Sequence, residues 1–312
     1  MKVIKAIKDI DIEFDTVVTI GNFDGVHKGH QVLIEKTADY AKARGIKSAV
    51  FTFLNHPINY FVPEKVKNIF DEKEKERLIE SFGIDYLIDI PFDKAMTKIS
   101  AEQFIVKILK DKIHAKKIVV GHDFTFARNK EGNADVLRDM GHEYGIEVEI
   151  VQPIKINGIR VSSTFIRELI SEGRVDEIPQ YLGTHYVIEG EIIHGKANGR
   201  KMGYPTANIS LKDQIINPKN GIYASRVIID GKKYFGATNV GMNPTVNGKY
   251  LSIETNILDF NEDIYGKRVR IEFLEKIRDE KKFKSLDELR KQLDLDTGFV
   301  RQKYMSNEKI ND

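Results

Sequence analysis

Residues 16–30 read TVVTIGNFDGVHKGH, and this stretch decides the fold of the first half of the chain. The apolar run 16–20 predicts a buried strand, and the helical pattern from His30 to Arg44, which stops at Gly45, predicts a helix soon after it. Three glycines and His27 lie in the turn between them, and His30 stands at the start of the helix. In an open α/β sheet, such a turn at the start of a helix offers unpaired N–H groups to phosphate.

The same alternation of strand and helix continues beyond this turn. Strand-like runs at 48–53, 86–90, 117–120 and 147–151 are interleaved with helical runs at 72–81, 101–110 and 134–144. The helical run at 101–110 starts behind a capping-box pair, Ser100 and Gln103. Alternation of this kind predicts a mostly parallel sheet with helices on both faces, so we expect an α/β domain.

After about Leu182 the pattern changes to short β-rich runs separated by Gly, Asn and Pro. These runs are 186–193, 222–229, 233–238, 252–258 and 269–273. Asp230-Gly231 is a hairpin signal between two of them, and the whole predicts an antiparallel barrel or sandwich. A closing helix is expected over 285–293, behind a second capping-box pair, Ser285 and Glu288. We therefore predict two domains, residues 1–182 and 183–312.

The composition limits the class of protein. Its 312 residues are 41% hydrophobic and 31% charged, which suits two globular domains. The 49 Lys and Arg against 47 Asp and Glu leave a net charge of +2, which is too small to gather nucleic acid non-specifically. The absence of cysteine excludes disulfides, thiolate metal sites and cysteine nucleophiles. With no apolar run near the ~20 residues of a membrane helix and no leader pattern, a cytoplasmic protein is expected.

The first candidate site is the pair His27 and His30. Because the two residues are three apart at a helix start, both imidazoles can face one point. Two such donors would stabilise the charge that gathers on an α-phosphate during in-line attack. Ordinary turn histidines and a metal-binding pair are the alternatives. No Gly-x-Gly-x-x-Gly occurs at this turn and no Walker A motif occurs anywhere, so phosphates must be held in another way.

Three further polar segments follow predicted strands or open a helix. His56 comes after the strand at 48–53, and Asp123 comes after the strand at 117–120. Residues 161–167, VSSTFIR, open a helix in which Ser163, Thr164 and Arg167 would cradle an anion. An N-cap followed by a surface arginine is the alternative for this last segment.

The second half carries its own candidate site. Residues 195–208 read GKANGRKMGYPTAN, in which glycines and cations suit a polyphosphate, although an exposed hairpin loop is the alternative. The Thr206 hydroxyl and the Asn208 amide oxygen are ligands that Mg²⁺ accepts. Glu254 lies in a strand-like run and is either a functional carboxylate or an outward-facing strand acid.

The order of these motifs resembles the bacterial bifunctional riboflavin kinase/FAD synthetase family over about residues 12–300. The His-x-Gly-His turn alone is similar to the nucleotidylyltransferase superfamily. The motifs are HKGH at 27–30, GHDFTF at 121–126, SSTFIR at 162–167, GYPTAN at 203–208, NVGMNPT at 239–245, IE at 253–254, DIYG at 263–266, IR at 277–278 and KF at 282–283. The Pro-Thr-x-Asn segment with the downstream glutamate is the most specific part.

This resemblance implies two enzymatic modules. A Rossmann-like N-terminal nucleotidylyltransferase domain would join AMP from ATP to FMN, giving FAD and pyrophosphate. A C-terminal β-barrel kinase domain would phosphorylate riboflavin with ATP. The substrates would be the small molecules riboflavin, FMN and ATP, with Mg²⁺ as cofactor and with no nucleic acid or membrane as partner. The oligomeric state stays open, and a homo-oligomer is compatible with the sequence.

The resemblance also assigns roles to residues. His27 and His30 would stabilise the adenylyl-transfer transition state, and Glu254 would take the proton from the ribityl hydroxyl. Thr206 and Asn208 would hold Mg²⁺–ATP. Nucleotide and phosphates would be bound by Gly21, Asn22, Phe23, Asp24, Gly25, His56, Asp123, Ser163, Thr164, Arg167, Gly195, Lys196, Gly199, Gly203 and Pro205.

Two positions depart from the family's pattern, and three other interpretations stay open. Ala127 stands where Gly is usual, and Phe165 stands where Arg is usual, which removes a cation beside the anion site. One alternative is that only one module is active and the other is a scaffold or flavin-sensing domain. A different adenylyl- or cytidylyltransferase fused to a partner-binding barrel is the second. A nucleic-acid-binding barrel is the third, disfavoured because aromatics and cations do not interleave regularly on the predicted strands.

Overall fold

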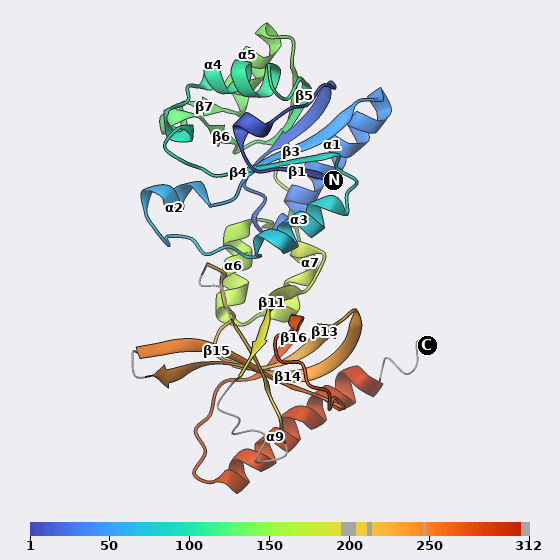
Figure 1. The fold of residues 1–312 in the computed structure, drawn as a ribbon, viewed down its shortest axis with the longest axis vertical. Helices are drawn as coiled ribbons and strands as arrows, with labels where there is room; N and C mark the ends of the chain where they lie inside the picture. The colour runs from blue at the N-terminus through green and yellow to red at the C-terminus, as the bar shows by residue number, and fades with distance from the viewer. Residues whose placement is uncertain (195–203, 211–213, 246–247, 307–312) are drawn as a thin grey trace. The chain divides into compact units, whose positions relative to one another are not determined.

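The computed structural model of the chain describes residues 1–194, 204–210, 214–245 and 248–306, with no account of the side chains of 243–250. Its contacts divide the chain into two compact units, Met1–Ser163 and Thr164–Asp312. The first unit is the predicted α/β domain, and the second contains the predicted β-rich domain (Figure 1).

A six-stranded parallel sheet forms the centre of the first unit, in the order β1-β4-β3-β2-β5-β8. Its strands are β1 (Lys2–Ile4), β2 (Thr16–Ile20), β3 (Lys47–Phe53), β4 (Tyr86–Ile90), β5 (Ala115–Gly121) and β8 (Glu147–Val151). From β2 the chain proceeds to β3 and β4 on one side, and then to β5 and β8 on the other. Ligands bind at such a switch point, beyond the carboxyl ends of the strands, which here means the turn that follows β2.

Helices cover both faces of this sheet. They are α1 (Lys28–Arg44), α3 (Glu72–Glu80), α4 (Ala101–Gln103), its π-helical continuation η4 (Phe104–Lys110) and α5 (Ala134–Glu143). Successive residues of β2 point to opposite faces. Val17 packs in a cluster with Ile34 of α1, whereas Val18 packs in a second cluster with Phe104 and Leu137. The predicted capping box of Ser100 and Gln103 is confirmed at the start of α4.

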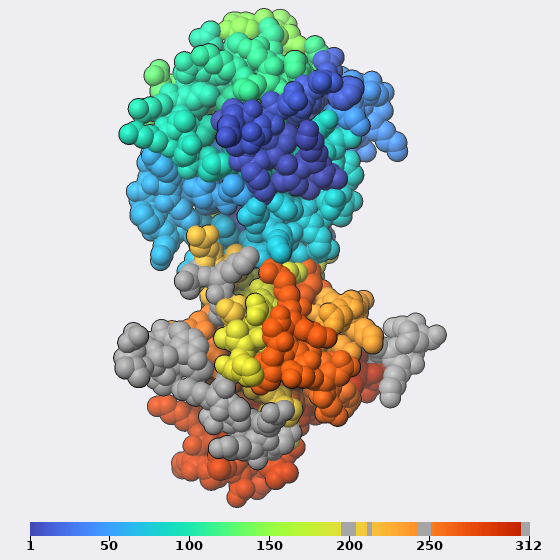
Figure 2. Space-filling view, in the orientation of Figure 1, coloured from blue at the N-terminus to red at the C-terminus, as the bar shows by residue number. Residues whose placement is uncertain are grey.

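Strand β1 was not expected from the sequence, because three residues are too few to show a period. It pairs in parallel with β4 and forms the edge of the sheet. In the space-filling view the dark-blue N-terminal segment lies directly against the cyan segment that includes α3 (Figure 2). Lys5 adds ion pairs with Glu72 and Glu76 of that helix.

A closed antiparallel barrel forms the centre of the second unit, in the strand order β11-β12-β15-β14-β13-β16. The strands are β11 (Tyr186–Ile193), β12 (Ala207–Ile209), β13 (Gly221–Ile229), β14 (Lys232–Thr245), β15 (Gly248–Ile257) and β16 (Arg268–Arg278). The predicted hairpin at Asp230-Gly231 joins β13 to β14, with both residues at positive φ as a tight hairpin requires. Of the two forms expected from the sequence, the structure is the barrel.

The closing helix α9 (Leu286–Val300) runs beyond its predicted end and lies beside the barrel in Figure 1. Val300 packs with Phe235 and Leu274 of the strands. The predicted capping box is half correct. The Ser285 hydroxyl accepts from the Glu288 N–H at 3.1 Å, but the Glu288 carboxylate accepts from the N–H of Lys284 rather than of Ser285.

The division between the compact units differs from the predicted boundary at 182/183. Helix α6 (Ser163–Glu172), from its second residue on, and helix α7 (Pro179–Leu182) belong with the barrel. The Lys219 N–H donates to the Ile170 carbonyl at 3.2 Å, which ties α6 to the segment before β13. The change of periodicity in the sequence marks where the strands begin, but it does not show which neighbour the preceding helices pack against.

We expect residues 164–312, expressed alone, to unfold cooperatively, and residues 183–312 to be much less stable. The shorter fragment lacks the buried side chains Ile166, Leu169, Ile170, Val175, Ile178, Tyr181 and Leu182. Burying an apolar side chain contributes about 1.5–3 kcal/mol, so the summed loss is comparable to the whole stability of an ordinary domain. Thermal denaturation of both fragments by circular dichroism measures the difference, and equal melting temperatures would contradict the division at 163/164.

Within the four described ranges, none of the helices has the length and apolar character that crossing a bilayer requires.

Candidate active sites

The turn after β2 is held in one conformation by its own sequence. Gly25 has φ +79°, and a Cβ there would lie 2.8 Å from the Ile69 side chain, so the position requires glycine. The Asp24 carboxylate accepts from the Ile69 N–H at 2.8 Å. The Thr52 hydroxyl of β3 donates to the Asn22 carbonyl at 3.0 Å. These contacts fix where α1 begins.

The structure brings His27 and His30 together. His27 is the N-cap of α1, and its Nδ1 accepts from the His30 N–H at 3.2 Å, which leaves the Nε2 of the neutral ring as the donor. The two rings are stacked, with centroids 3.6 Å apart and planes 16° apart. A Cβ at Gly29 would lie 3.1 Å from His27 Nδ1, so the glycine of this motif makes room for the first imidazole.

His30 is held in its neutral form. Burial and the neighbouring His27 both lower the pKa of His30 well below its ordinary value. The edge-on ring of Phe23 lies 5.2 Å from it, and in the described part of the chain the buried Nδ1 has no hydrogen-bond partner. A neutral imidazole with one ring N–H fits a hydrogen-bond donor to a phosphate oxygen.

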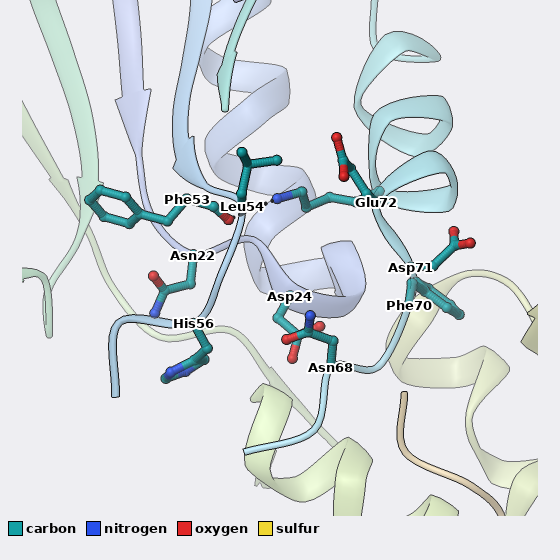
Figure 3. A pocket seen from close by; sticks show the side chains of 10 residues that line it. Asn22, Asp24, Phe53, Leu54, His56, Asn68, Phe70, Asp71 and Glu72 are labelled. Atoms are coloured by element: carbon teal, nitrogen blue, oxygen red, sulfur yellow. Dashed lines mark hydrogen bonds between the residues drawn. The ribbon is translucent and has the colours of Figure 1, made fainter. Parts of the chain in front are cut away.

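A pocket beside this turn brings three predicted residues together (Figure 3). Asn22, Asp24 and His56 line it, and His56 is also the N-cap of the short helix α2 (Pro57–Phe61). Lys75 of α3 lines it as well, and its Nζ donates to the Phe53 carbonyl and to the buried carboxylate of Asp89, both at 3.0 Å. Lys75 and Asp89 were not among the predicted residues, because nothing in a single sequence shows that they meet.

The remaining predicted residues of this site are not among those that line the pocket. Asp123, just after β5, accepts from Arg160 of the short strand β10 (Ile159–Arg160), a partner that the sequence did not indicate. The hydroxyl of Ser163, the last residue of the first unit, donates to the Asp24 carbonyl at 2.8 Å. Thr164 and Arg167 follow on α6 and belong to the second compact unit.

Of the two residues that depart from the family's pattern, Ala127 and Phe165, the second packs against a neighbouring ring. Its ring meets the buried Tyr181 ring edge-on, with centroids 5.0 Å apart.

Ala127 has φ +66° and ψ −179°, a backbone conformation that is essentially reserved for glycine. Ala127→Gly is therefore expected to stabilise the chain by about 1–3 kcal/mol through relief of this strain. Chemical denaturation of parent and variant measures the change, with Ala38→Gly in helix α1 as the control that should instead destabilise by about 1 kcal/mol. A destabilised Ala127→Gly variant would contradict the strain.

The second candidate site lies on the outer face of the barrel. On β15, Ile253 and Thr255 are buried in the barrel, so the half-buried Glu254 between them points outward. It is in register with Asn208 of β12 on one side and Asn239 of β14 on the other. Residues directly opposite each other share a face, so a carboxylate and two amides are neighbours there.

Neighbouring contacts hold this arrangement. The Ser252 hydroxyl donates to Glu254 Oε1 at 3.0 Å. The Asn256 amide donates to the Pro205 carbonyl at 2.8 Å, which ties the segment carrying Thr206 to β15. Asn239 was not among the predicted site residues, although it is the first residue of the NVGMNPT motif, one of the motifs that carry the family resemblance. The predicted residues Gly195, Lys196, Gly199 and Gly203 lie outside the described residues.

Comparison with known proteins assigns each half of the chain to a protein family. The model of the family described as FAD synthetase matches residues 9–165, and that of the family described as riboflavin kinase matches residues 182–304. The bifunctional riboflavin kinase/FMN adenylyltransferase of Escherichia coli is 34% identical over 297 residues, which cover 94% of this chain and 95% of the relative. The chain belongs to the bifunctional riboflavin kinase/FMN adenylyltransferase family.

Other proteins match over nearly the whole length of the chain. The enzyme of Buchnera aphidicola from Acyrthosiphon pisum is 36% identical over 311 residues, covering 98% of this chain and 99% of the relative. A solved structure from Streptococcus pneumoniae, described as a macrolide-efflux protein, has a TM-score of 0.88 at 36% identity, covering 96% of this chain and 98% of that one. Family membership removes the interpretations of an unrelated transferase fusion and of a nucleic-acid-binding barrel.

Proposed function

We propose that the barrel unit phosphorylates riboflavin with ATP to give FMN, and that the α/β unit then adenylylates FMN with a second ATP to give FAD and pyrophosphate. The FAD synthetase assignment rests on the stacked rings of His27 and His30 at the switch point of the sheet, where the pKa of His30 is lowered. The riboflavin kinase assignment rests on Glu254, which lies between the amides of Asn208 and Asn239. The full-length identity to relatives named for both activities supports their occurrence in one chain.

In the adenylyl transfer, a phosphate oxygen of FMN attacks the α-phosphorus of ATP, and the bond to the pyrophosphate oxygen breaks. The charge that builds on the α-phosphate receives hydrogen bonds from the histidine pair and from the N–H groups at the start of α1. Burial keeps His30 neutral, so it acts as a positioned donor. Asn22, Asp24, His56, Asp123 and Ser163 would orient the nucleotide around this point, with Thr164 and Arg167 retained as predicted ligands.

In the kinase reaction, Glu254 takes the proton of the terminal ribityl hydroxyl as its oxygen attacks the γ-phosphorus of ATP and ADP leaves. The hydrogen bond from Ser252 orients the carboxylate for this transfer. Thr206 and Asn208 offer a hydroxyl and an amide oxygen, a donor set that fits a hard cation such as Mg²⁺. When bound, Mg²⁺ would neutralise charge on the ATP phosphates.

The test is a single incubation of the full chain with riboflavin, ATP and Mg²⁺, followed by chromatographic separation of the flavins. We expect FMN to appear first and FAD to follow, and both to disappear with a metal chelator. FMN without FAD would favour the alternative in which only the kinase is active. FAD from added FMN, with no FMN from riboflavin, would favour the opposite alternative.

A further inference from the structure

A second carboxylate lies on the barrel face that carries Glu254. Gly241 of β14 is two residues from Asn239, which is in register with Glu254. Alternate residues of a strand share a face, so Gly241 lies on the same face of the barrel as Glu254. A Cβ at Gly241 would lie 2.3 Å from Glu280 Oε1 and 3.5 Å from the Asn239 amide nitrogen. The Glu280 carboxylate therefore fills the space that any other residue at position 241 would occupy.

Glu280 is an exposed residue, and a single hydrogen bond orients its carboxylate. Its Oε2 accepts from the Asn220 amide at 3.0 Å, and among the described residues this is its one hydrogen-bond partner. Two cations of β16 pair with other acids: Arg278 binds the buried Asp296 at 2.7 Å, and Lys276 binds Asp279 at 2.5 Å. Oε1 thus keeps its capacity to accept hydrogen bonds from a ligand.

Glu280 lies against a strand position that is a diagonal neighbour of Glu254. Gly241 and Glu254 are diagonal neighbours across β14 and β15, and such positions are about 7–8 Å apart. A polyol chain carries one hydroxyl donor on each carbon and can span this distance. One end can then meet Glu254 while a hydroxyl further along meets Glu280.

We propose that Glu280 is a substrate-binding residue of the kinase site, which accepts hydrogen bonds from the ribityl hydroxyls of the flavin and so aligns the terminal hydroxyl with Glu254. Gly241 is the position that makes room for it. This inference rests on the proposed kinase function of the barrel, and it adds a residue that recognises the polyol part of the substrate.

The test uses two variants of the full chain that disrupt the same interaction in different ways. Glu280→Ala removes the carboxylate, and Gly241→Ala keeps it but displaces it. Loss of a hydrogen bond to a charged group is expected to raise the KM for riboflavin by about 10–100-fold in each variant, with kcat changed less than about threefold. Asp279→Asn, at the neighbouring acid that pairs with Lys276, is the control and should keep the parental KM.

Two further measurements separate the possible outcomes. Inhibition of the kinase by lumiflavin, which has a methyl group in place of the ribityl chain, should be the same in parent and Glu280→Ala. A parental riboflavin KM in Glu280→Ala would overturn the role of Glu280, and so would a shift confined to the Mg²⁺ dependence, which would make it a metal ligand. A parent chain that makes no FMN would instead overturn the proposed kinase function.

Discussion

His27→Ala and His30→Ala are each expected to lower the rate of FAD formation from FMN by about 10²–10³-fold, the usual loss for one donor that stabilises a developing oxyanion. FMN formation from riboflavin should stay near the parental rate, because Glu254 and its neighbours lie in a separate compact unit. Initial rates of both reactions, measured on the same preparation of each variant, give the ratio directly.

Substitution of His27 has a second effect that must be separated from the first. Because its Nδ1 caps α1, an alanine there also removes an N-cap, at a cost of about 1 kcal/mol. His27→Asn retains a capping acceptor and removes the imidazole, so it should melt like the parent and still lose FAD formation. His142→Ala, at an exposed position of α5, is the control for losing a histidine. A folded His27→Asn enzyme with parental FAD formation would overturn the role of the ring.

Glu254→Gln is expected to lower kinase turnover by about 10²–10⁴-fold, because the amide keeps the size of the side chain but cannot accept the proton. The KM for riboflavin should change little. FAD formation from added FMN should persist, and this serves as the internal control for the folded α/β unit. Steady-state kinetics with riboflavin as the varied substrate separate turnover from KM.

A matched control distinguishes catalysis from stability. Glu191→Gln changes an exposed acid on β11 of the same barrel, and it should alter neither rate by a measurable factor. If Glu254 were only an outward strand residue, its replacement would shift the free energy of unfolding by no more than about 0.5 kcal/mol and leave turnover intact. That result would require the base to be sought elsewhere on the barrel.

Most of the fold follows from local pattern, and the exceptions have local causes. The runs at β2, β3 and β4 are buried and mostly apolar because both faces of a parallel sheet are covered, so their position and type were predicted correctly. Strand β1 is too short to show such a pattern. The place of α6 depends on which unit buries its apolar face, and an amphipathic sequence contains no information on its partner.

In the candidate sites too, local contacts could be predicted from the sequence and long-range contacts could not. His27 and His30 could be predicted to meet, because their spacing at a helix start determines it, and Gly29 between them is explained by the ring that lies above it. The pairing of Asp123 with Arg160 joins residues 37 positions apart, and the position of Asn239 beside Glu254 depends on strand register. Such long-range pairings are products of tertiary structure.

The closed barrel has a consequence for how the kinase residues are kept in place. In an open sheet, a strand that slips by one residue turns every side chain to the opposite face, and an exposed edge invites such slippage. A closed sheet has no edge, so a slip between any two strands would have to be matched around the whole ring. The alignment of Asn208, Glu254 and Asn239 is therefore enforced by ring closure, and the surrounding loops can vary in evolution without misaligning the three side chains.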